Sequence, residues 1–364
     1  MDNIEINATI IGGGIIGLLT AYELKKKFPA WEIALIEAAP FLGDHSTGRN
    51  SGVLHAGLYY PTNSHKHLLC IEGLHLWKHK LSQELGIDLK ECGKVVFAKN
   101  ANEESGLEDI WIKANQNGVE GLSRLSEKKL QEINAFVEAK AAFFSPHTGI
   151  IDVTGALKKI TNAFENLGGM IAKNCQVNHI EKNDKFKLKT SHYNITSDFV
   201  INAAGFFGTS IREHLGLSGI ANSLVKGNYI STSQKLEHPH LFYPVPPKDL
   251  KGLGVHSTLD MDGKIKFGPN TEDVSAVDYS DTQSALKLMA PEITNIFKGI
   301  DASKLYWDYA GIRSKIINTE NGKLETDFWI KSPIPGYIEC LGIESPGLTS
   351  APAIVKKILN DFIP

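Results

Sequence analysis

The feature that most constrains the fold is a glycine-rich turn near the N-terminus. Residues 8–11 (Ala-Thr-Ile-Ile) form an apolar run typical of a buried parallel strand. Three glycines then follow with the G-x-G-x-x-G spacing: Gly12, Gly14 and Gly17. In this pattern the first glycine permits a tight turn and the second lets a pyrophosphate approach the backbone. The third lets the following helix pack closely on the strand.

The residues after the turn favour the same interpretation. A helix that begins at the turn presents free N–H groups and the positive end of its dipole to phosphates. Residues 33–36 read as a second buried strand, and Glu37 follows it, where an acidic side chain accepts a hydrogen bond from a ribose hydroxyl. Because strand, turn, second strand and acid occur in the required order, the sequence predicts a dinucleotide-binding site.

Two later segments favour FAD as the dinucleotide. Residues 199–205 (Phe-Val-Ile-Asn-Ala-Ala-Gly) resemble the strand that passes beside the cofactor in FAD-dependent oxidoreductases, although an ordinary buried strand explains them equally well. Residues 340–351 resemble the last strand, loop and helix start of the same superfamily. There the helix N-terminus points at the flavin ring and stabilises the negative charge of the reduced form. Together the segments predict FAD rather than NAD.

The composition fits a globular enzyme and excludes several other classes. The chain has 364 residues, enough for two domains, and its net charge of -3 gives no electrostatic argument for nucleic-acid binding. No apolar run approaches the ~20 residues that a membrane span needs. The acidic first residues lead directly into a strand, so we expect no targeting segment. Four widely spaced cysteines suggest neither a metal site nor disulfides, which favours a cytoplasmic location.

We expect an α/β fold with two interleaved domains. One is a Rossmann-like FAD-binding domain of the glutathione-reductase type, formed by three segments, residues 1–75, 145–215 and 325–364. The other is an inserted α+β substrate-binding domain, formed by two segments, residues 76–144 and 216–324. Alternating strand-like runs and turns over residues 225–270 predict that the inserted domain is built on an antiparallel sheet. Helical patterns are expected in residues 68–85 and 152–167, and two polar helices are expected in residues 103–134.

Three further segments narrow the family. Residues 48–57 read Gly-Arg-Asn-Ser-Gly-Val-Leu-His-Ala-Gly, residues 254–258 read Gly-Val-His-Ser-Thr, and residues 309–313 read Tyr-Ala-Gly-Ile-Arg. Together they strongly resemble the L-2-hydroxyglutarate dehydrogenase (oxidase) family within the D-amino-acid-oxidase-like flavoproteins, over essentially the whole chain. The resemblance implies FAD-dependent oxidation of L-2-hydroxyglutarate to 2-oxoglutarate, by hydride transfer from C2 to flavin N5. The electrons would pass to a quinone or to oxygen.

Such an oxidation needs a base that removes the hydroxyl proton. His55 and His256 are the candidates, because an imidazole titrates near neutral pH and both lie in glycine-flanked segments. The alternative for each is a structural histidine bonded to backbone. The sequence leaves open which of the two takes the proton, and whether FAD is attached covalently through His55.

Oxidation of a hydroxy acid also needs groups that hold the substrate carboxylates. Arg313 is the best candidate, because its planar fork suits bidentate pairing and its segment resembles the carboxylate-binding Gly-Leu-Arg of related amino-acid oxidases. The alternative for Arg313 is a surface salt bridge. Lys66 either pairs with the distal carboxylate or extends from a helix surface. Tyr59 either binds a carboxylate or covers the flavin.

The cofactor-binding residues are expected in the glycine turn, the acid after the second strand, the loop after it and the later FAD-type segments. Val177 is included because this fold often places a valine there whose backbone contacts adenine. The full set is Gly12, Gly14, Ile16, Gly17, Glu37, Thr47, Arg49, Asn50, Ser51, Gly52, Val177, Ala204, Gly205, Gly347, Leu348 and Thr349.

Two other functions stay open at this point. The first is an amine or amino-acid oxidase on the same scaffold, with Arg313 in the same role. The second is a flavin-binding redox interaction module without turnover, against which the presence of His55, His256 and Arg313 argues. The sequence decides neither the electron acceptor nor the oligomeric state. Nor does it decide whether the protein contacts the inner membrane peripherally.

Overall fold

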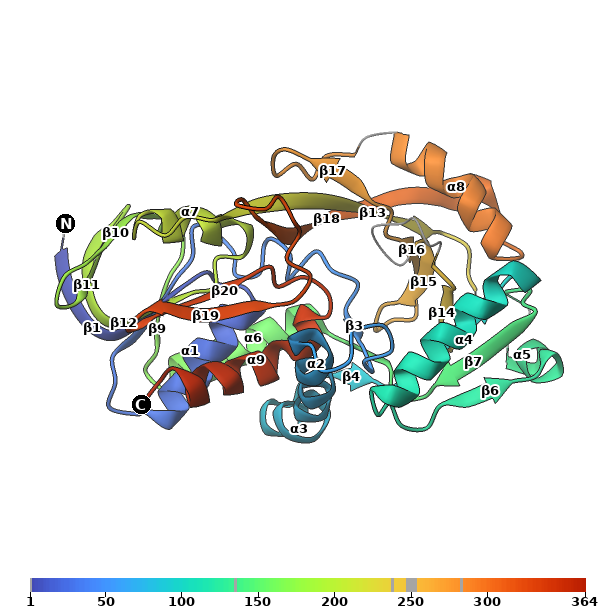
Figure 1. Ribbon diagram of the computed structural model, residues 1–364, viewed down its shortest axis with the longest axis horizontal. Helices are drawn as coiled ribbons and strands as arrows, with labels where there is room; N and C mark the ends of the chain where they lie inside the picture. The colour runs from blue at the N-terminus through green and yellow to red at the C-terminus, as the bar shows by residue number, and fades with distance from the viewer. Residues whose placement is uncertain (1, 134–135, 237–238, 247–253, 282–283) are drawn as a thin grey trace.

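The computed structural model describes residues 2–133, 136–236, 239–246, 254–281 and 284–364. Within these residues the strands form one eight-stranded sheet, one nine-stranded sheet and a small three-stranded sheet. The two large sheets lie side by side along the longest axis of the molecule (Figure 1). Both FAD-type architecture and an additional sheet domain were expected, and this mixed α/β arrangement confirms the expected fold class.

The first sheet contains the predicted strands of the glycine-turn unit. At its centre, β1 (Asp2–Ile11) pairs in parallel with β2 (Ile33–Ile36) and with β12 (Tyr193–Asn202). The sheet continues through β9 (Met170–Ala172) on one side. On the other side lie β10 (Val177–Lys182), β11 (Phe186–Thr190), β19 (Trp329–Ile334) and β20 (Tyr337–Leu341).

Three helices cover one face of this sheet, as Figure 1 shows: α1 (Ile15–Lys27), α6 (Val153–Asn166) and α9 (Gly347–Asp361). Apolar side chains of these helices and of β1 and β2 form one continuous core. The short helices η2 (Gly205–Phe207) and α7 (Gly208–Glu213) follow the carboxyl end of β12, and α7 contacts β10, β12 and β20. The core therefore fixes the N-termini of α1 and α9 relative to the strand ends.

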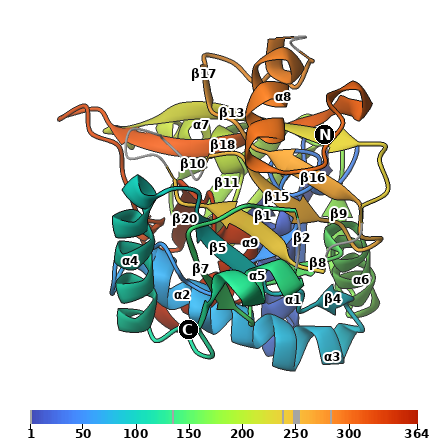
Figure 2. The same cartoon turned by 90° about the vertical axis from the view of Figure 1, so that its right-hand side faces the viewer.

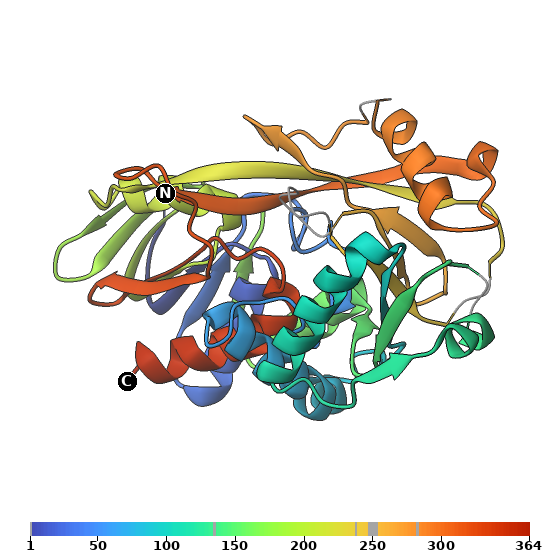
Figure 3. The same ribbon diagram turned by 45° about the vertical axis from the view of Figure 1, so that its right-hand side comes forward.

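The second sheet is antiparallel except for one parallel pair. Its strands are β17 (Glu272–Val274), β13 (Ile220–Thr232), β16 (Ile265–Gly268), β15 (His256–Leu259), β14 (Leu241–Pro244), β5 (Lys94–Ala98), β7 (Ala141–Ser145), β6 (Ser123–Leu125) and β18 (Leu305–Asn318). The parallel pair is β5 with β14. Figures 1 and 3 show that β13 and β18, the long strands of this sheet, run along the top of the molecule and extend towards the first sheet.

Two longer helices, α4 (Ala101–Gln116) and α8 (Ser284–Ile296), pack on different parts of this second sheet. In Figure 2, α4 lies beside β5 and β7, while α8 lies beside β13 and β18. The remaining short helices are α5 (Glu127–Ile133) and η3 (Ala302–Lys304). In the described residues, no helix is long and apolar enough to cross a membrane.

A helical segment and the small sheet join the two large sheets. The segment comprises α2 (His65–Leu76), the π-helical turn η1 (Trp77–Leu81) and α3 (Ser82–Leu85), and it ends at Gly86, which has a left-handed φ of 65°. The small sheet comprises β3 (Val53–Leu54), β4 (Leu89–Lys90) and β8 (Gly149–Ile151). At Gly73 a Cβ atom would overlap the carbonyl oxygen of Thr349, so α2 and α9 touch through their backbones.

The expected helices are confirmed, with one addition. The pattern over residues 68–85 corresponds to α2, η1 and α3, and that over 152–167 to α6, whose N-terminus is capped by Asp152. The pattern over 103–134 corresponds to α4 and α5, but strand β6 separates them. In residues 225–270 the expected strands are present, and positions 237–238 and 247–253 lie outside the described residues. The division into two domains at the expected boundaries stays a prediction.

Candidate active site

A cavity of about 1000 Å³ is lined by residues from both large sheets. One end of it lies at the carboxyl ends of β1, β2 and β12, where Ile11, Ile36 and Ala203 line the wall. Ligands of open α/β sheets bind at this edge, because the loops and helix N-termini meet there. The other end is lined by His55, His256 and the residues around Arg313. The cavity is thus long and continuous, as an extended dinucleotide requires.

The glycine turn brings the start of α1 to this cavity. Gly12 has a φ of 107°, and a Cβ atom there would overlap the carbonyl oxygen of Ala203. Gly14 is the N-cap residue of α1 and supplies no side-chain cap, although Thr47 Oγ1 accepts from the Ile15 N–H. The other N–H groups of the first turn of α1 and the positive end of its dipole face the space that a pyrophosphate would fill. Gly12, Gly14 and Ile16 line the cavity, whereas Gly17 lies behind the turn, where only a glycine fits against Gly12.

Glu37 is held rigidly at the adenosine end. Its Oε2 accepts a hydrogen bond of 2.7 Å from the Gly13 N–H, and its Oε1 accepts one of 2.7 Å from the Ala39 N–H. Each carboxylate oxygen can accept more than one hydrogen bond, so the group can still accept from a ribose hydroxyl. Val177 lines the cavity beside it, where adenine contact was expected.

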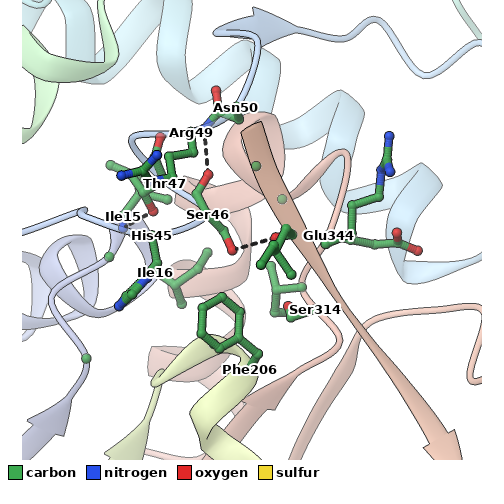
Figure 4. A pocket seen from close by; sticks show the side chains of 18 of the residues that line it. Ile15, Ile16, His45, Ser46, Thr47, Arg49, Asn50, Phe206, Ser314 and Glu344 are labelled. Carbon is green, nitrogen blue, oxygen red and sulfur yellow. Dashed lines mark hydrogen bonds between the residues drawn. The ribbon is translucent and has the colours of Figure 1, made fainter. Parts of the chain in front are cut away.

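The loop after β2 is held together by its own polar groups (Figure 4). Thr47 Oγ1 accepts from the Ile15 N–H at 3.0 Å, and Asn50 Nδ2 donates to the carbonyl oxygens of Ser46 and Thr47 at 3.2 and 2.6 Å. The Arg49 guanidinium lies 3.9 Å from the centre of the Tyr279 ring. Thr47, Arg49 and Asn50 line the cavity together with Ser51.

Gly52 does not line the cavity. It has a φ of 67° and directly precedes β3. The sequence therefore placed this glycine correctly in the loop but wrongly in the cavity wall, since its role is a turn that leads the chain into β3.

A second helix N-terminus borders the far part of the cavity. Gly347, Leu348 and Thr349 at the start of α9 line it, and Pro346, the N-cap residue, supplies no side-chain cap. Thr349 Oγ1 accepts from the backbone N–H of His55 at 2.9 Å, which ties α9 to the segment after β3. Ala204 and Gly205 line the cavity as well. Two helix N-termini along one cavity suit a ligand with a pyrophosphate and a redox ring that becomes negative.

The two candidate bases lie in the same part of the cavity and are buried. Burial lowers the pKa of His55 well below 6.5, and the nearby Lys94 and His256 lower it further. Burial lowers the pKa of His256 to about 3. The expectation that they titrate near neutral pH is wrong, because neither imidazolium is solvated in this environment. Both side chains are therefore neutral at pH 7 and each has a nitrogen able to accept a proton.

The partners of the ring nitrogens differ between the two histidines. The Nδ1 of His256 lies 2.8 Å from the Gly254 carbonyl oxygen, so it carries a hydrogen and leaves Nε2 as an acceptor. The Nδ1 of His55 lies 3.5 Å from Lys94 Nζ, and its Nε2 lies 3.4 Å from Ser345 Oγ. The tautomer of His55 therefore depends on the protonation state of Lys94.

Two polar groups at the cavity have no hydrogen-bond partner among the described residues. They are Nη1 of Arg313 and the hydroxyl of Tyr59, and both atoms are buried. A buried donor without a partner costs about 1–3 kcal/mol, so native proteins rarely keep one unless a ligand satisfies it. The structure thus brings the expected carboxylate-binding groups to the cavity that contains His55 and His256.

Lys66 is the exception among the expected substrate-binding residues. It does not line the cavity, and its Nζ lies 2.8 Å from Oε1 of Glu344. Lys315 Nζ lies 2.8 Å from the same oxygen, and the two ammonium groups hold the pKa of Glu344 below its usual value despite burial. The direct contact expected between Lys66 and the distal carboxylate is not supported, because its charge is taken up by Glu344.

Sequence reasoning missed Lys94, which is fully buried in β5. The one sequence signal for a buried lysine at this position is that Lys94 directly precedes the apolar run of residues 95–98, and the strand that they form is buried throughout. Nothing in the local pattern distinguishes it from a lysine at the exposed end of a strand.

Comparison with known proteins agrees with this geometry. Residues 7–359 match the family model described as "DAO: FAD dependent oxidoreductase". The mitochondrial L-2-hydroxyglutarate dehydrogenase of Homo sapiens is 32% identical, with 98% of this chain and 88% of that protein covered. The L-2-hydroxyglutarate dehydrogenase of Indibacter alkaliphilus is 28% identical, with 96% of this chain and 97% of that protein covered.

Solved structures share the fold. The dithionite-reduced L-alpha-glycerophosphate oxidase of Mycoplasma pneumoniae with FAD bound has a TM-score of 0.88 at 24% identity, covering 98% of this chain and 95% of that one. The glycine oxidase of Geobacillus kaustophilus has a TM-score of 0.82 at 18% identity, covering 99% of this chain and 95% of that one.

Proposed function

Because the chain belongs to the DAO family of FAD-dependent oxidoreductases, we propose that it oxidises L-2-hydroxyglutarate to 2-oxoglutarate. The observation that carries the proposal is a guanidinium nitrogen of Arg313 that has no hydrogen-bond partner in the described part of the chain, in a cavity that also holds two neutral histidines. A carboxylate next to a hydroxyl group satisfies both features. The names of the relatives with 28–35% identity supply the particular hydroxy acid.

The residues along the cavity fit FAD. The pyrophosphate is assigned to the N-terminus of α1 at Gly14, the ribose hydroxyls to Glu37, and the flavin to the N-terminus of α9 at Gly347. Once bound, FAD supplies the oxidant that accepts a hydride from substrate C2.

Arg313 binds the carboxylate next to C2 in this proposal. Its Nη1 has no partner among the described residues, so binding exchanges an unsatisfied buried donor for a charge-assisted hydrogen bond. The Tyr59 hydroxyl, also buried and unpartnered, donates to the second carboxylate. The two anchors fix the direction in which the C2 hydrogen points, and only one enantiomer can direct it at the oxidant.

A neutral histidine takes the hydroxyl proton. Burial lowers the pKa of both His55 and His256, so neither must lose a proton before it acts at pH 7. The electrons then pass to a quinone or to oxygen, and reoxidation of the substrate-reduced enzyme by each one distinguishes them.

The test is anaerobic mixing of the yellow holoprotein with candidate substrates while the flavin absorbance is followed. L-2-Hydroxyglutarate should bleach the flavin and yield 2-oxoglutarate, and the D-enantiomer should not. Lactate lacks the second carboxylate and should react about 10- to 100-fold more slowly, since one hydrogen bond to a charged group is lost. Bleaching by glycine, sarcosine or proline but by neither hydroxy acid would contradict the proposal and favour an amine oxidase.

A further inference from the structure

Lys94 is a fully buried cationic side chain in the centre of the second sheet. It begins β5, which lies between β14 and β7, and its exposed fraction is 0%. It does not line the cavity, so it has no direct contact with substrate. A buried lysine is costly unless it is paired or loses its charge, so its position calls for a physical reason.

The surroundings of Lys94 contain no carboxylate among the described residues that pairs with it. Its Nζ lies 3.5 Å from His55 Nδ1, 3.9 Å from the centre of the Tyr243 ring and 5.4 Å from that of Tyr59. Aromatic faces stabilise an ammonium group, but they do not neutralise it. The titratable groups that face it come from several elements: His55, Tyr59, Cys70, Cys92, Tyr243 and His256.

Both protonation states of Lys94 are accessible near neutral pH. Burial lowers its pKa from 10.5 to about 7, and the neighbouring Cys70 and Cys92 oppose only part of that shift. As an ammonium group it donates to His55 Nδ1, so that His55 Nε2 carries the hydrogen. As a neutral amine it accepts from His55 Nδ1–H, and Nε2 then offers a lone pair. Only the second arrangement lets His55 Nε2 accept a proton.

We propose that Lys94 is a positioning residue that sets the tautomer of His55 and receives the proton that His55 passes on during substrate oxidation. The inference rests on the proposed oxidation of a hydroxy acid. The substrate O–H bond breaks as an Nε2–H bond forms on His55, and the Nδ1–H bond breaks as an Nζ–H bond forms on Lys94. His55 is neutral before and after, and the positive charge ends on Lys94, beside the Tyr243 ring. The hydride from C2 goes to FAD, the oxidant of the family's reaction.

The first test compares the pH dependence of anaerobic flavin reduction in wild-type protein, Lys94→Met and Lys94→Arg. In the wild type the rate of reduction by L-2-hydroxyglutarate should rise with pH through about 7, as Lys94 loses its proton. Methionine cannot accept a proton and arginine does not lose one. In both variants the rise in rate near pH 7 should therefore disappear, and flavin reduction should be about 100-fold slower.

The matched control is Lys25→Met in α1. Lys25 is also buried, but its Nζ donates to the carbonyl oxygens of Pro29 and Trp31 at 3.0 and 2.7 Å, and it does not line the cavity. This variant reports the general effect of removing a buried lysine. In Lys25→Met the rate of flavin reduction should still rise with pH near pH 7.

The second test does not depend on turnover. The free energy of unfolding is measured against pH for the same set of holoproteins. Between about pH 7 and about 10 the unfolded state binds a proton at Lys94 that the folded state does not, so this lysine makes stability rise with pH. Lys94→Met should lack that part of the rise, and Lys25→Met should keep it.

Two results would overturn the inference. One is a rate step near pH 7 that survives Lys94→Met, above all if His256→Ala abolishes it, because His256 would then be the base. The other is an unchanged pH dependence of stability in Lys94→Met. A wild-type flavin that stays oxidised with every hydroxy acid would instead refute the proposed function, and the relay with it. The two failures are therefore distinguishable.

Discussion

Replacing Arg313 by methionine should make the protein more stable and nearly inactive. The Arg313 Nη1 is buried without a partner among the described residues, which costs about 1–3 kcal/mol, while methionine keeps much of the apolar stem. With an unfolding entropy of about 2.1 cal/mol/K per residue over 364 residues, 1 kcal/mol corresponds to about 1.3 °C in Tm. Because part of the side chain faces the cavity, we expect the lower half of that range, about 1–2 kcal/mol, which corresponds to a rise in Tm of about 1–3 °C.

The loss of activity should be much larger than the gain in stability. A bidentate carboxylate clamp contributes two charge-assisted hydrogen bonds of about 1.5–3 kcal/mol each, so substrate-dependent flavin reduction should fall about 10²- to 10⁴-fold. Arg313→Lys is the matched variant, since it keeps the charge but loses the planar fork of the guanidinium. Its rate of flavin reduction should lie between those of the wild type and Arg313→Met.

The assay combines thermal unfolding of the FAD-loaded proteins with rapid-mixing reduction by L-2-hydroxyglutarate under anaerobic conditions. Flavin content, read from absorbance, should be the same in all three proteins, because Arg313 is assigned to substrate. An Arg313→Met protein that is less stable and reduces its flavin at the wild-type rate would refute the reasoning, since the guanidinium would then be a structural group.

Other substitutions test separate parts of the site. Glu37→Arg removes the acceptor of the Gly13 and Ala39 N–H groups and should yield protein with little bound flavin by absorbance; normal flavin content would argue against the ribose assignment. Gly73→Ala should lower Tm and loosen FAD together, because its Cβ would overlap the Thr349 carbonyl oxygen; an unchanged Tm would contradict the close helix contact. His55→Ala should slow reduction about 100-fold at normal flavin content, and an unchanged rate would exclude it as the base.

The sequence was sufficient for the part of the site that rests on local patterns. The glycine spacing, the strands on both sides of it and Glu37 are separated by few residues, and their geometry follows from a single strand–helix–strand unit. The FAD-type segments around residues 199–205 and 340–351 were also placed correctly at the cavity. In each case a run of neighbouring residues determines the backbone shape, and the cavity there is bordered by backbone turns and by the N-termini of α1 and α9.

The tertiary structure decided the charges of the site. Lys66 was expected at the substrate, yet it pairs with Glu344, 278 positions away in the chain. Lys94 lies 39 positions from His55 and reaches it only because the second sheet packs against the segment after β3. Burial and the identity of distant neighbours set a pKa, so no local pattern could show that the pKa values of His55 and His256 lie well below 6.5. Nor could a local pattern show that Nη1 of Arg313 is buried with no hydrogen-bond partner among the described residues. Local sequence order therefore determined the glycine turn and the strand ends at which the cofactor is proposed to bind. Packing between segments far apart determined the charges and pKa values of the side chains at the cavity, because electrostatic energies depend on distance in space and on exclusion of water.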